Sequence, residues 1–100
     1  MIKGTVLYGH PKDADAFEKY YSETHLPLVG KTKGIFRSEY TRFSPNPDGS
    51  EASYYRMAEL YFEGLAEMQQ ALNSPEGKAM AADLANFSTD GVTTLFGAVE

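Results

Sequence analysis

Apolar residues recur at helical spacing between residues 13 and 29, in the segment DADAFEKYYSETHLPLV. Asp13 is a favourable N-cap, and six later residues share one helical face. These are Phe17, Tyr20, Tyr21, Thr24, His25 and Leu28. Pro27 disfavours the α conformation before it and has no amide hydrogen for the carbonyl of Glu23. The pattern therefore predicts a helix that ends or kinks just after His25, with aromatic rings and a histidine on its apolar side.

Alternating apolar and polar residues predict four strands, at residues 2–8, 35–43, 53–62 and 92–99. The segment 44–50, SPNPDGS, is dense in turn formers and predicts a hairpin between the second and third strands. A periodic stretch over residues 65–72 predicts a short amphipathic helix. A second helical piece starts at the N-cap Ser74, with a proline in its first position, and ends at the breaker segment 88–91.

The order of elements is β-α-β-β-α-β in one domain, residues 1–100. This order is typical of the α+β class with a ferredoxin-like split βαβ arrangement, in which helices cover one face of a four-stranded antiparallel sheet. The first, third and fourth strands are apolar on both sides, so one apolar sheet face is left uncovered. We expect a second copy to cover it, giving a homodimer through the sheet face and a dimeric α+β barrel of eight strands.

Composition and charge exclude several classes of partner. The net charge is −5 and the nine Lys and Arg residues are spread singly, so no basic patch is expected for nucleic acid or for anionic lipid. No apolar run is long enough to span a membrane, and the first residues are too short for a signal peptide. Cysteine is absent, which suits a reducing cytoplasm, where we expect this protein to work. Seven tyrosines are more hydroxyls than a small core needs, which indicates a half-polar cavity or an interface.

Several segments together resemble the EthD family of dimeric α+β barrel proteins, over nearly the whole chain. The segments are Leu7-Tyr8, Phe17, Tyr20-Tyr21, ETHLPL at 23–28, YYRMAELYF at 54–62, SPEG at 74–77 and GVTTL at 91–95. The family is named for an accessory protein of ethyl tert-butyl ether degradation. Its wider superfamily includes cofactor-free monooxygenases, haem-degrading enzymes, muconolactone isomerases and polyketide cyclases. The resemblance implies the barrel fold and the dimer, and it leaves the reaction open.

His25 is the candidate catalytic residue. A neutral imidazole can take a proton from carbon next to a carbonyl or from a phenol, a step that an isomerase, a cyclase and a cofactor-free oxygenase share. In superfamily members of known activity a histidine facing the cavity beside the sheet serves in this way, and the resemblance implies the same role for His25. The alternative is a histidine that bonds a backbone carbonyl and fixes the turn before Pro27.

We therefore expect a pocket between the sheet and the first helix that takes a small apolar carbonyl or phenolic metabolite. Whether the protein is an enzyme stays open, because a non-catalytic accessory or ligand-binding homodimer of a degradation pathway would use the same pocket, and a filled barrel would leave a purely structural dimer. Five tyrosines are candidate substrate-binding residues, with a core or interface role as the alternative. They are Tyr8, Tyr20, Tyr21, Tyr40 and Tyr61.

Glu59 lies in the middle of an apolar strand, where a carboxylate has to be paired or protonated. Its candidate partners are Arg37, Arg42 and Arg56, in an ion pair across the sheet or across the dimer seam, and a role as general acid is the alternative. His10 lies in a Gly-His-Pro turn and is expected at the surface. No His, Asp and Glu residues stand at metal-ligand spacing, no nucleotide motif is present and no basic residues are placed for haem propionates, so no metal and no cofactor are expected.

Overall fold

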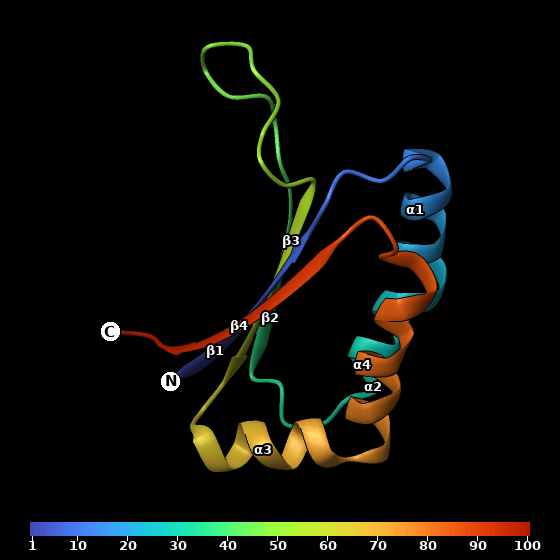
Figure 1. Ribbon diagram of the computed structural model, residues 1–100. Helices are drawn as coiled ribbons and strands as arrows, with labels where there is room; N and C mark the ends of the chain where they lie inside the picture. The colour runs from blue at the N-terminus through green and yellow to red at the C-terminus, as the bar shows by residue number, and fades with distance from the viewer.

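The computed structural model describes residues 1–100 and shows a four-stranded antiparallel sheet with helices packed on one face (Figure 1). The strands are β1 (Ile2–Tyr8), β2 (Arg37–Arg42), β3 (Arg56–Phe62) and β4 (Val92–Ala98), in the order β2-β3-β1-β4. The helical segments are α1 (Ala14–Tyr20), the π-helical turn η1 (Tyr21–His25), α2 (Leu26–Lys31), α3 (Leu65–Asn73) and α4 (Pro75–Phe87). The predicted α+β ferredoxin-like fold is confirmed. None of the helices has the length and apolar character needed to cross a bilayer.

The first helix does not end after His25, so that part of the prediction is wrong. The amide of Leu26 bonds to the carbonyl of Tyr21 in the wider π-helical turn, and helical backbone then continues to Lys31. Pro27 falls in the first turn of α2, where a missing amide hydrogen does least harm. The chain therefore changes from a π-helical turn to an α-helix just before the proline, and does not leave the helical conformation. Such π-helical turns are frequent at functional sites.

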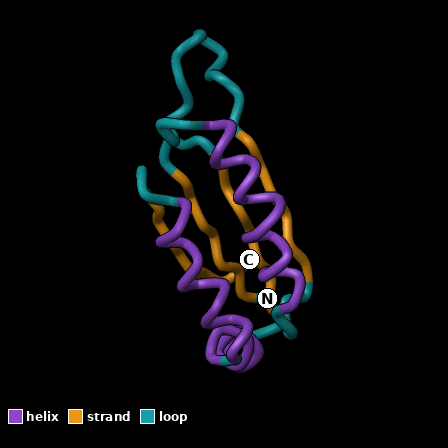
Figure 2. Tube along the Cα trace, turned by 90° about the vertical axis from the view of Figure 1, so that its right-hand side faces the viewer, coloured by secondary structure: helices purple, strands orange, loops and turns teal.

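The pleat of the sheet decides which side chains meet the helices. In β1 and β3 the residues at alternate positions, among them Val6, Tyr8, Ala58 and Leu60, point toward the helical layer. In Figure 2 the column formed by α1, η1 and α2 lies beside α4 over the strands, with α3 seen nearly end on below them. The core is therefore a single layer between the sheet and the two helical columns.

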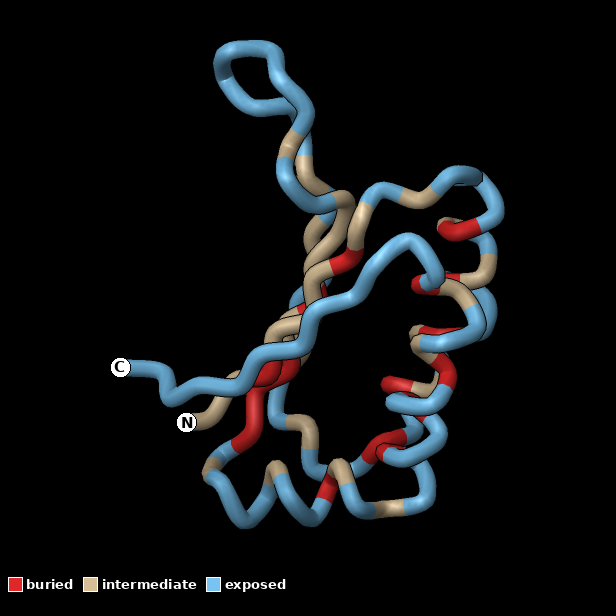
Figure 3. The backbone as a smooth tube through the Cα atoms, viewed as in Figure 1, coloured by how far each residue is buried: buried red, intermediate tan, exposed pale blue.

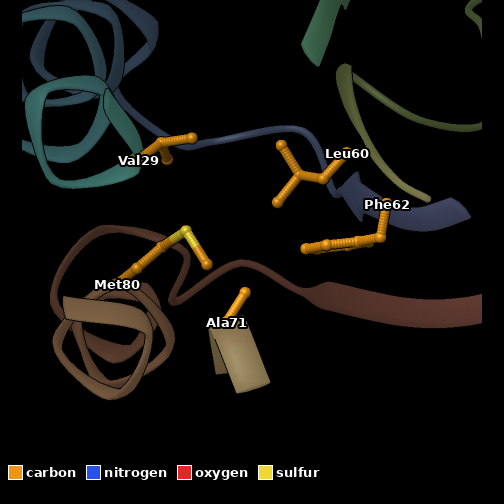
Figure 4. Packing of buried hydrophobic residues seen from close by; sticks show 5 residues of the cluster. All are labelled: Val29, Leu60, Phe62, Ala71 and Met80. Carbon is orange, nitrogen blue, oxygen red and sulfur yellow. The ribbon is translucent and has the colours of Figure 1, made fainter. Parts of the chain in front are cut away.

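Two groups of buried side chains fill this layer. One group takes side chains from α2, α3 and α4 onto the end of β3 (Figure 4): Val29, Leu60, Phe62, Ala71 and Met80. The other is mainly aromatic and lies near the other end of the strands: Tyr8, Phe17, Tyr21 and Ala58. Buried positions gather on the central strands and on the inner sides of the helices, whereas β4 is exposed along its whole length (Figure 3).

The sheet face opposite the helices carries apolar side chains and one ion pair. Leu95 and Val99 of this region are exposed by 55% and 46% of their surface. The carboxylate of Glu59 lies 2.9 Å from Nζ of Lys3 on the neighbouring strand. Within one chain none of the arginines predicted as partners of Glu59 pairs with it, because the pleat turns Arg56 and Arg42 toward the helices, while Arg37 stacks over a tyrosine ring.

The segment between β2 and β3 projects beyond the sheet as a long loop (Figure 1). Its tip is closed by hydrogen bonds among its own residues, including Asn46 to Ser50 and Ser50 to Asp48, and Gly49 has the positive φ of 88° that its turn needs. His10 is exposed, as predicted, and its Nε2 lies 2.6 Å from the carbonyl oxygen of Ala52 at the base of this loop.

Candidate functional site

A cavity of about 200 Å³ lies between the helix-facing side of the sheet and the helices. Its floor comes from all four strands, and its walls come from η1, α2, α3 and α4. Almost all of its lining is hydrophobic, and the polar groups in it belong to His25, Tyr8, Tyr21, Tyr40 and Thr94. Such a lining favours a mostly apolar ligand oriented by few polar contacts.

Small residues on the strands help to leave this space open. Gly4 of β1 lies beneath the ring of Phe96 on β4, and a Cβ at this position would come within 2.9 Å of that ring. Ala58 of β3 also lines the cavity, where a larger side chain would fill it. The floor of the cavity therefore depends on short side chains at these two positions.

His25 closes the π-helical turn and is 3% exposed. Its Nδ1 lies 2.9 Å from Oδ2 of Asp83 on α4, and its ring packs against that of Phe87 at a centroid distance of 4.6 Å. The imidazole makes no capping hydrogen bond to the helix backbone, so the alternative role proposed for it from the sequence is not what the structure shows. Because an ionised Asp83 accepts the proton of Nδ1, Nε2 is left as the ring nitrogen with a free lone pair.

Asp83 is held by three donors. The hydroxyl of Tyr20 donates to Oδ1 at 2.6 Å, the amide of Asn86 donates to the same oxygen at 3.0 Å, and His25 binds the other oxygen. Burial raises the pKa of the Asp83 carboxyl, but these hydrogen bonds outweigh burial and hold the pKa below its ordinary value. The carboxylate is therefore charged at neutral pH.

The two members of this pair affect each other's protonation. Burial lowers the pKa of His25, and the Asp83 carboxylate acts in the opposite direction. Burial prevails, so the pKa lies below its ordinary value and the imidazole is neutral near pH 7. The pair thus presents a neutral, oriented base at the wall of an apolar cavity.

Tyr21 and Tyr8 supply hydroxyl groups next to this base. The Tyr21 ring lies nearly parallel to the His25 ring, with centroids 5.8 Å apart, and its hydroxyl is buried without a hydrogen-bond partner. The Tyr8 hydroxyl is close enough to influence the pKa of Tyr21, yet no hydrogen bond of normal geometry joins the two. Burial raises the pKa of both phenols, although the nearby Arg56 acts in the opposite direction. Both hydroxyls therefore keep their protons and act as donors at neutral pH.

The structure brings four of the six sequence-predicted site residues together at the cavity: His25, Tyr8, Tyr21 and Tyr40. Tyr20 does not line it and instead holds Asp83 from outside. Tyr61 points to the opposite face of the sheet, where its hydroxyl lies 3.3 Å from the Glu39 carboxylate and its ring lies 4.2 Å from the Arg37 guanidinium. The pleat explains this placement, because residues 60 and 61 must face opposite sides.

Sequence reasoning missed Asp83. The signal was nevertheless present, because Asp83 shares a helical face with Met80, Leu84 and Phe87 at a spacing of three and four residues. A carboxylate on an otherwise apolar helical face needs a buried partner, as we argued for Glu59. Phe87, which packs on the His25 ring, belongs to the same face.

An ion-pair cluster fixes the first helix to the sheet next to the cavity. Glu18 of α1 accepts two hydrogen bonds from Arg56 of β3, at 2.9 and 2.7 Å, and a third from the hydroxyl of Tyr55. The hydrogen bonds from Arg56 lower the pKa of Glu18, so both partners are charged at neutral pH. The Arg56 guanidinium also lies 5.0 Å from the centre of the Tyr21 ring. No group of three or more His, Asp or Glu side chains is arranged to hold a metal ion.

Fold and site together define a small α+β protein with a ferredoxin-like fold and an apolar pocket between its sheet and its helices. The sequence model of the EthD domain matches residues 10–91, and the chain belongs to the EthD family. It is 45% identical over 96 residues to an uncharacterized 11.0 kDa protein of the thcB-thcC intergenic region of Rhodococcus erythropolis, a match that covers 96% of this chain and 92% of that protein.

Solved structures agree with this assignment. A crystal structure of an EthD family protein from Bacillus halodurans has a TM-score of 0.94 and 34% identity, and the match covers 100% of this chain and 99% of that one. A dimeric protein of unknown function with a ferredoxin-like fold from Bacteroides fragilis has a TM-score of 0.68 and 17% identity, covering 98% and 95% of the two chains. The second likeness concerns the fold alone.

Proposed function

We propose that this protein binds a small, mostly apolar compound that carries a carbonyl or phenolic group, and that His25 acts on it as a general base without a cofactor. The observation that carries this proposal is the pair between Nδ1 of His25 and Asp83 at the wall of the apolar cavity. The pair leaves Nε2 as the acceptor, and a buried neutral imidazole is a suitable base near pH 7.

The chemistry follows from the properties of the pair. Nε2 takes a proton from a carbon next to the carbonyl, or from the phenol, and the electron pair of the broken bond moves onto the ligand oxygen. Burial makes the resulting imidazolium costly, and the Asp83 carboxylate stabilises it. Return of the proton to a different carbon gives isomerisation, attack of the enolate on a second carbonyl gives cyclisation, and reaction of the anion with dioxygen as co-reactant gives oxygenation.

The second candidate function is a non-catalytic accessory or ligand-binding protein of a degradation pathway. The composition of the cavity favours this function, because a lining that is almost entirely hydrophobic, with a single histidine and no charged side chain, also suits simple storage or transfer of a ligand. In that function His25 would only orient the bound compound.

Deuterium exchange of phenylacetone in D₂O, followed by proton NMR, separates the two functions. We expect the wild-type protein to accelerate exchange at the carbon between the ring and the carbonyl. The protons on this carbon are acidic, and a molecule with one ring is of a size that suits the cavity. His25→Ala should reduce the rate to that of buffer, a loss of roughly 100-fold or more. His10→Ala is the matched control, since His10 is exposed and does not line the cavity.

Two outcomes would support the binding function instead. In the first, the wild-type protein binds phenylacetone but exchanges it no faster than buffer. In the second, the small acceleration seen with wild type is matched by His10→Ala, His25→Ala and free imidazole in buffer; a His25→Ala variant that keeps a protein-specific acceleration would instead contradict His25 as the base. Circular dichroism melting of each variant shows whether a loss of rate reflects loss of the fold.

We also propose that the protein is a homodimer through the uncovered sheet face and works in the cytoplasm. Exposed apolar side chains on β4 and just after it, among them Leu95 and Val99, support the first proposal, as does the dimeric protein of similar fold from Bacteroides fragilis. The lack of cysteine in a chain of 100 residues supports the second.

A further inference from the structure

The polar groups of the cavity differ in kind. His25 offers an acceptor at Nε2, whereas Tyr21 and Tyr8 offer hydroxyl donors whose pKa is raised by burial. Tyr21 is 2% exposed and its hydroxyl has no partner in the protein. A buried hydroxyl without a partner costs free energy, and a ligand oxygen that accepts its hydrogen bond would recover that cost.

The position of Tyr21 gives this hydroxyl a function beside the base. Tyr21 and His25 are the first and last residues of the same π-helical turn, and their nearly parallel rings both line the cavity. A ligand held by one of these side chains is therefore in reach of the other. The donor and the acceptor together match a ligand with an oxygen next to an acidic C–H bond.

The charges around the cavity restrict the ligand further. No Lys, Arg, Asp or Glu side chain lines the cavity. The guanidinium nearest to Tyr21, that of Arg56, lies on the face of its ring and is held in two hydrogen bonds by Glu18. A ligand carboxylate would lose its hydration without gaining a counter-ion, which is strongly unfavourable.

We infer that Tyr21, with Tyr8 beside it, forms an oxygen-binding subsite that selects neutral single-ring ketones over carboxylates and hydrocarbons of the same size. The volume of about 200 Å³ is somewhat larger than the ~150 Å³ of an apolar cavity that binds benzene, which fits one ring with a short substituent. This inference deepens the proposed function, and it rests on that proposal for the location of the ligand.

The Tyr21 hydroxyl should also accelerate the transfer of the proton to Nε2 of His25. When Nε2 takes the proton, negative charge develops on the ketone oxygen that Tyr21 binds. A hydrogen bond to an oxygen that becomes charged is stronger in the transition state than in the bound ketone, so it accelerates the step. Tyr21 is thus a catalytic residue by contact with the reacting group, in addition to His25.

Three probes of similar size test the subsite by isothermal titration calorimetry: acetophenone, ethylbenzene and benzoate. We expect the wild-type protein to prefer acetophenone over ethylbenzene by roughly two- to ten-fold, the effect of one neutral hydrogen bond, and to bind benzoate more weakly than either. Tyr21→Phe should remove the preference and leave the affinity for ethylbenzene unchanged. Tyr54→Phe is the matched control, because Tyr54 is 39% exposed and lies outside the cavity.

Equal affinity of the wild-type protein for acetophenone and ethylbenzene would overturn the inference, as would benzoate binding that matches acetophenone or no binding of any probe. A preference for acetophenone that survives in the Tyr8→Phe/Tyr21→Phe double variant would overturn it as well. The proposed function fails in a different way. If the protein does not accelerate the uptake of deuterium by phenylacetone but the ketone preference is present and depends on Tyr21, the subsite stands and the base does not.

Discussion

At the scale of single residues, the protonation of His25 depends on the atom that its Nδ1 binds. Without Asp83 no acceptor would fix the proton of the neutral imidazole on Nδ1. His25 can act as a base through Nε2 only in the tautomer that has its proton on Nδ1. Asp83 is in turn oriented by Tyr20 and Asn86, neither of which reaches the cavity. Asp83 is therefore a positioning residue, and it has a signature that a merely structural residue lacks.

That signature is a displaced pH profile in the variant Asp83→Asn. Base catalysis by His25 is lost as the pH falls through its pKa, which lies below the ordinary value because burial outweighs the effect of Asp83. Removing the carboxylate removes the one influence that raises this pKa, so the acidic limb of the rate profile should move to lower pH. The plateau rate should also fall by roughly 100-fold, because the amide of Asn can bind the wrong tautomer.

Deuterium exchange of phenylacetone measured between pH 4 and 8 gives both quantities. Asp90→Asn is the control, since Asp90 is exposed and its carboxylate binds only the backbone amide of Lys12. A lower plateau with an unmoved acidic limb would mean that Asp83 only supports the packing of α4. An acidic limb that moves to higher pH would contradict the assigned direction of the coupling.

At the scale of the elements, α3 and α4 meet at a corner where their backbones are in close contact. Gly77, in the first turn of α4, lies where α3 ends, and a Cβ there would meet the carbonyl oxygen of Ala71 and come within 3.0 Å of Cα of Leu72. Both neighbours are backbone atoms and cannot rotate away. Gly30 in α2 is the opposite case, because a Cβ there meets nothing within 4 Å.

These two glycines form a matched pair for a stability measurement. Gly77→Ala should destabilise the protein by about 1 to 3 kcal/mol, because the clash forces α3 and α4 apart. Gly30→Ala should stabilise it by up to about 1 kcal/mol, since alanine favours a helix and the site has room. Thermal unfolding followed by circular dichroism should separate the melting temperatures, at roughly 4 to 8 °C per kcal/mol. A Gly77→Ala variant as stable as wild type would mean that the α3–α4 corner is not closely packed.

The elements also show which features the sequence could predict. Strand alternation and the Ser74 N-cap are local signals, so the four strands and the last two helices were predicted with small errors at their ends. The continuation of the helix past Pro27 was not predictable, because it depends on a π-helical turn that tertiary packing stabilises. Contacts between side chains that are far apart in the sequence were the hardest feature to predict. The sequence placed His25, Tyr20 and Tyr21 on one helical face toward a pocket, but the contact of His25 with Asp83 joins residues 58 positions apart.

At the scale of the whole molecule, the helices leave one face of the sheet open. Alternation along β4 puts Thr94 and Phe96 toward the cavity, and it therefore puts Leu95 on the open face, where 55% of its surface is exposed. The core on the helical side is small for a stable domain, so a second copy on the open face would add the apolar burial that the single chain lacks.

A charge on the open face should therefore break the proposed dimer. We expect light scattering coupled to size-exclusion chromatography to give twice the chain mass of 11.0 kDa at micromolar concentration. Leu95→Asp should shift this mass toward 11.0 kDa, because a buried unpaired carboxylate would raise the dissociation constant by roughly 100-fold or more. Leu65→Asp is the matched control, since Leu65 is exposed to a similar extent, 56%, at the start of α3. A wild-type protein that elutes at 11.0 kDa, or a Leu65→Asp variant that dissociates as Leu95→Asp does, would remove the open sheet face as the site of dimerisation.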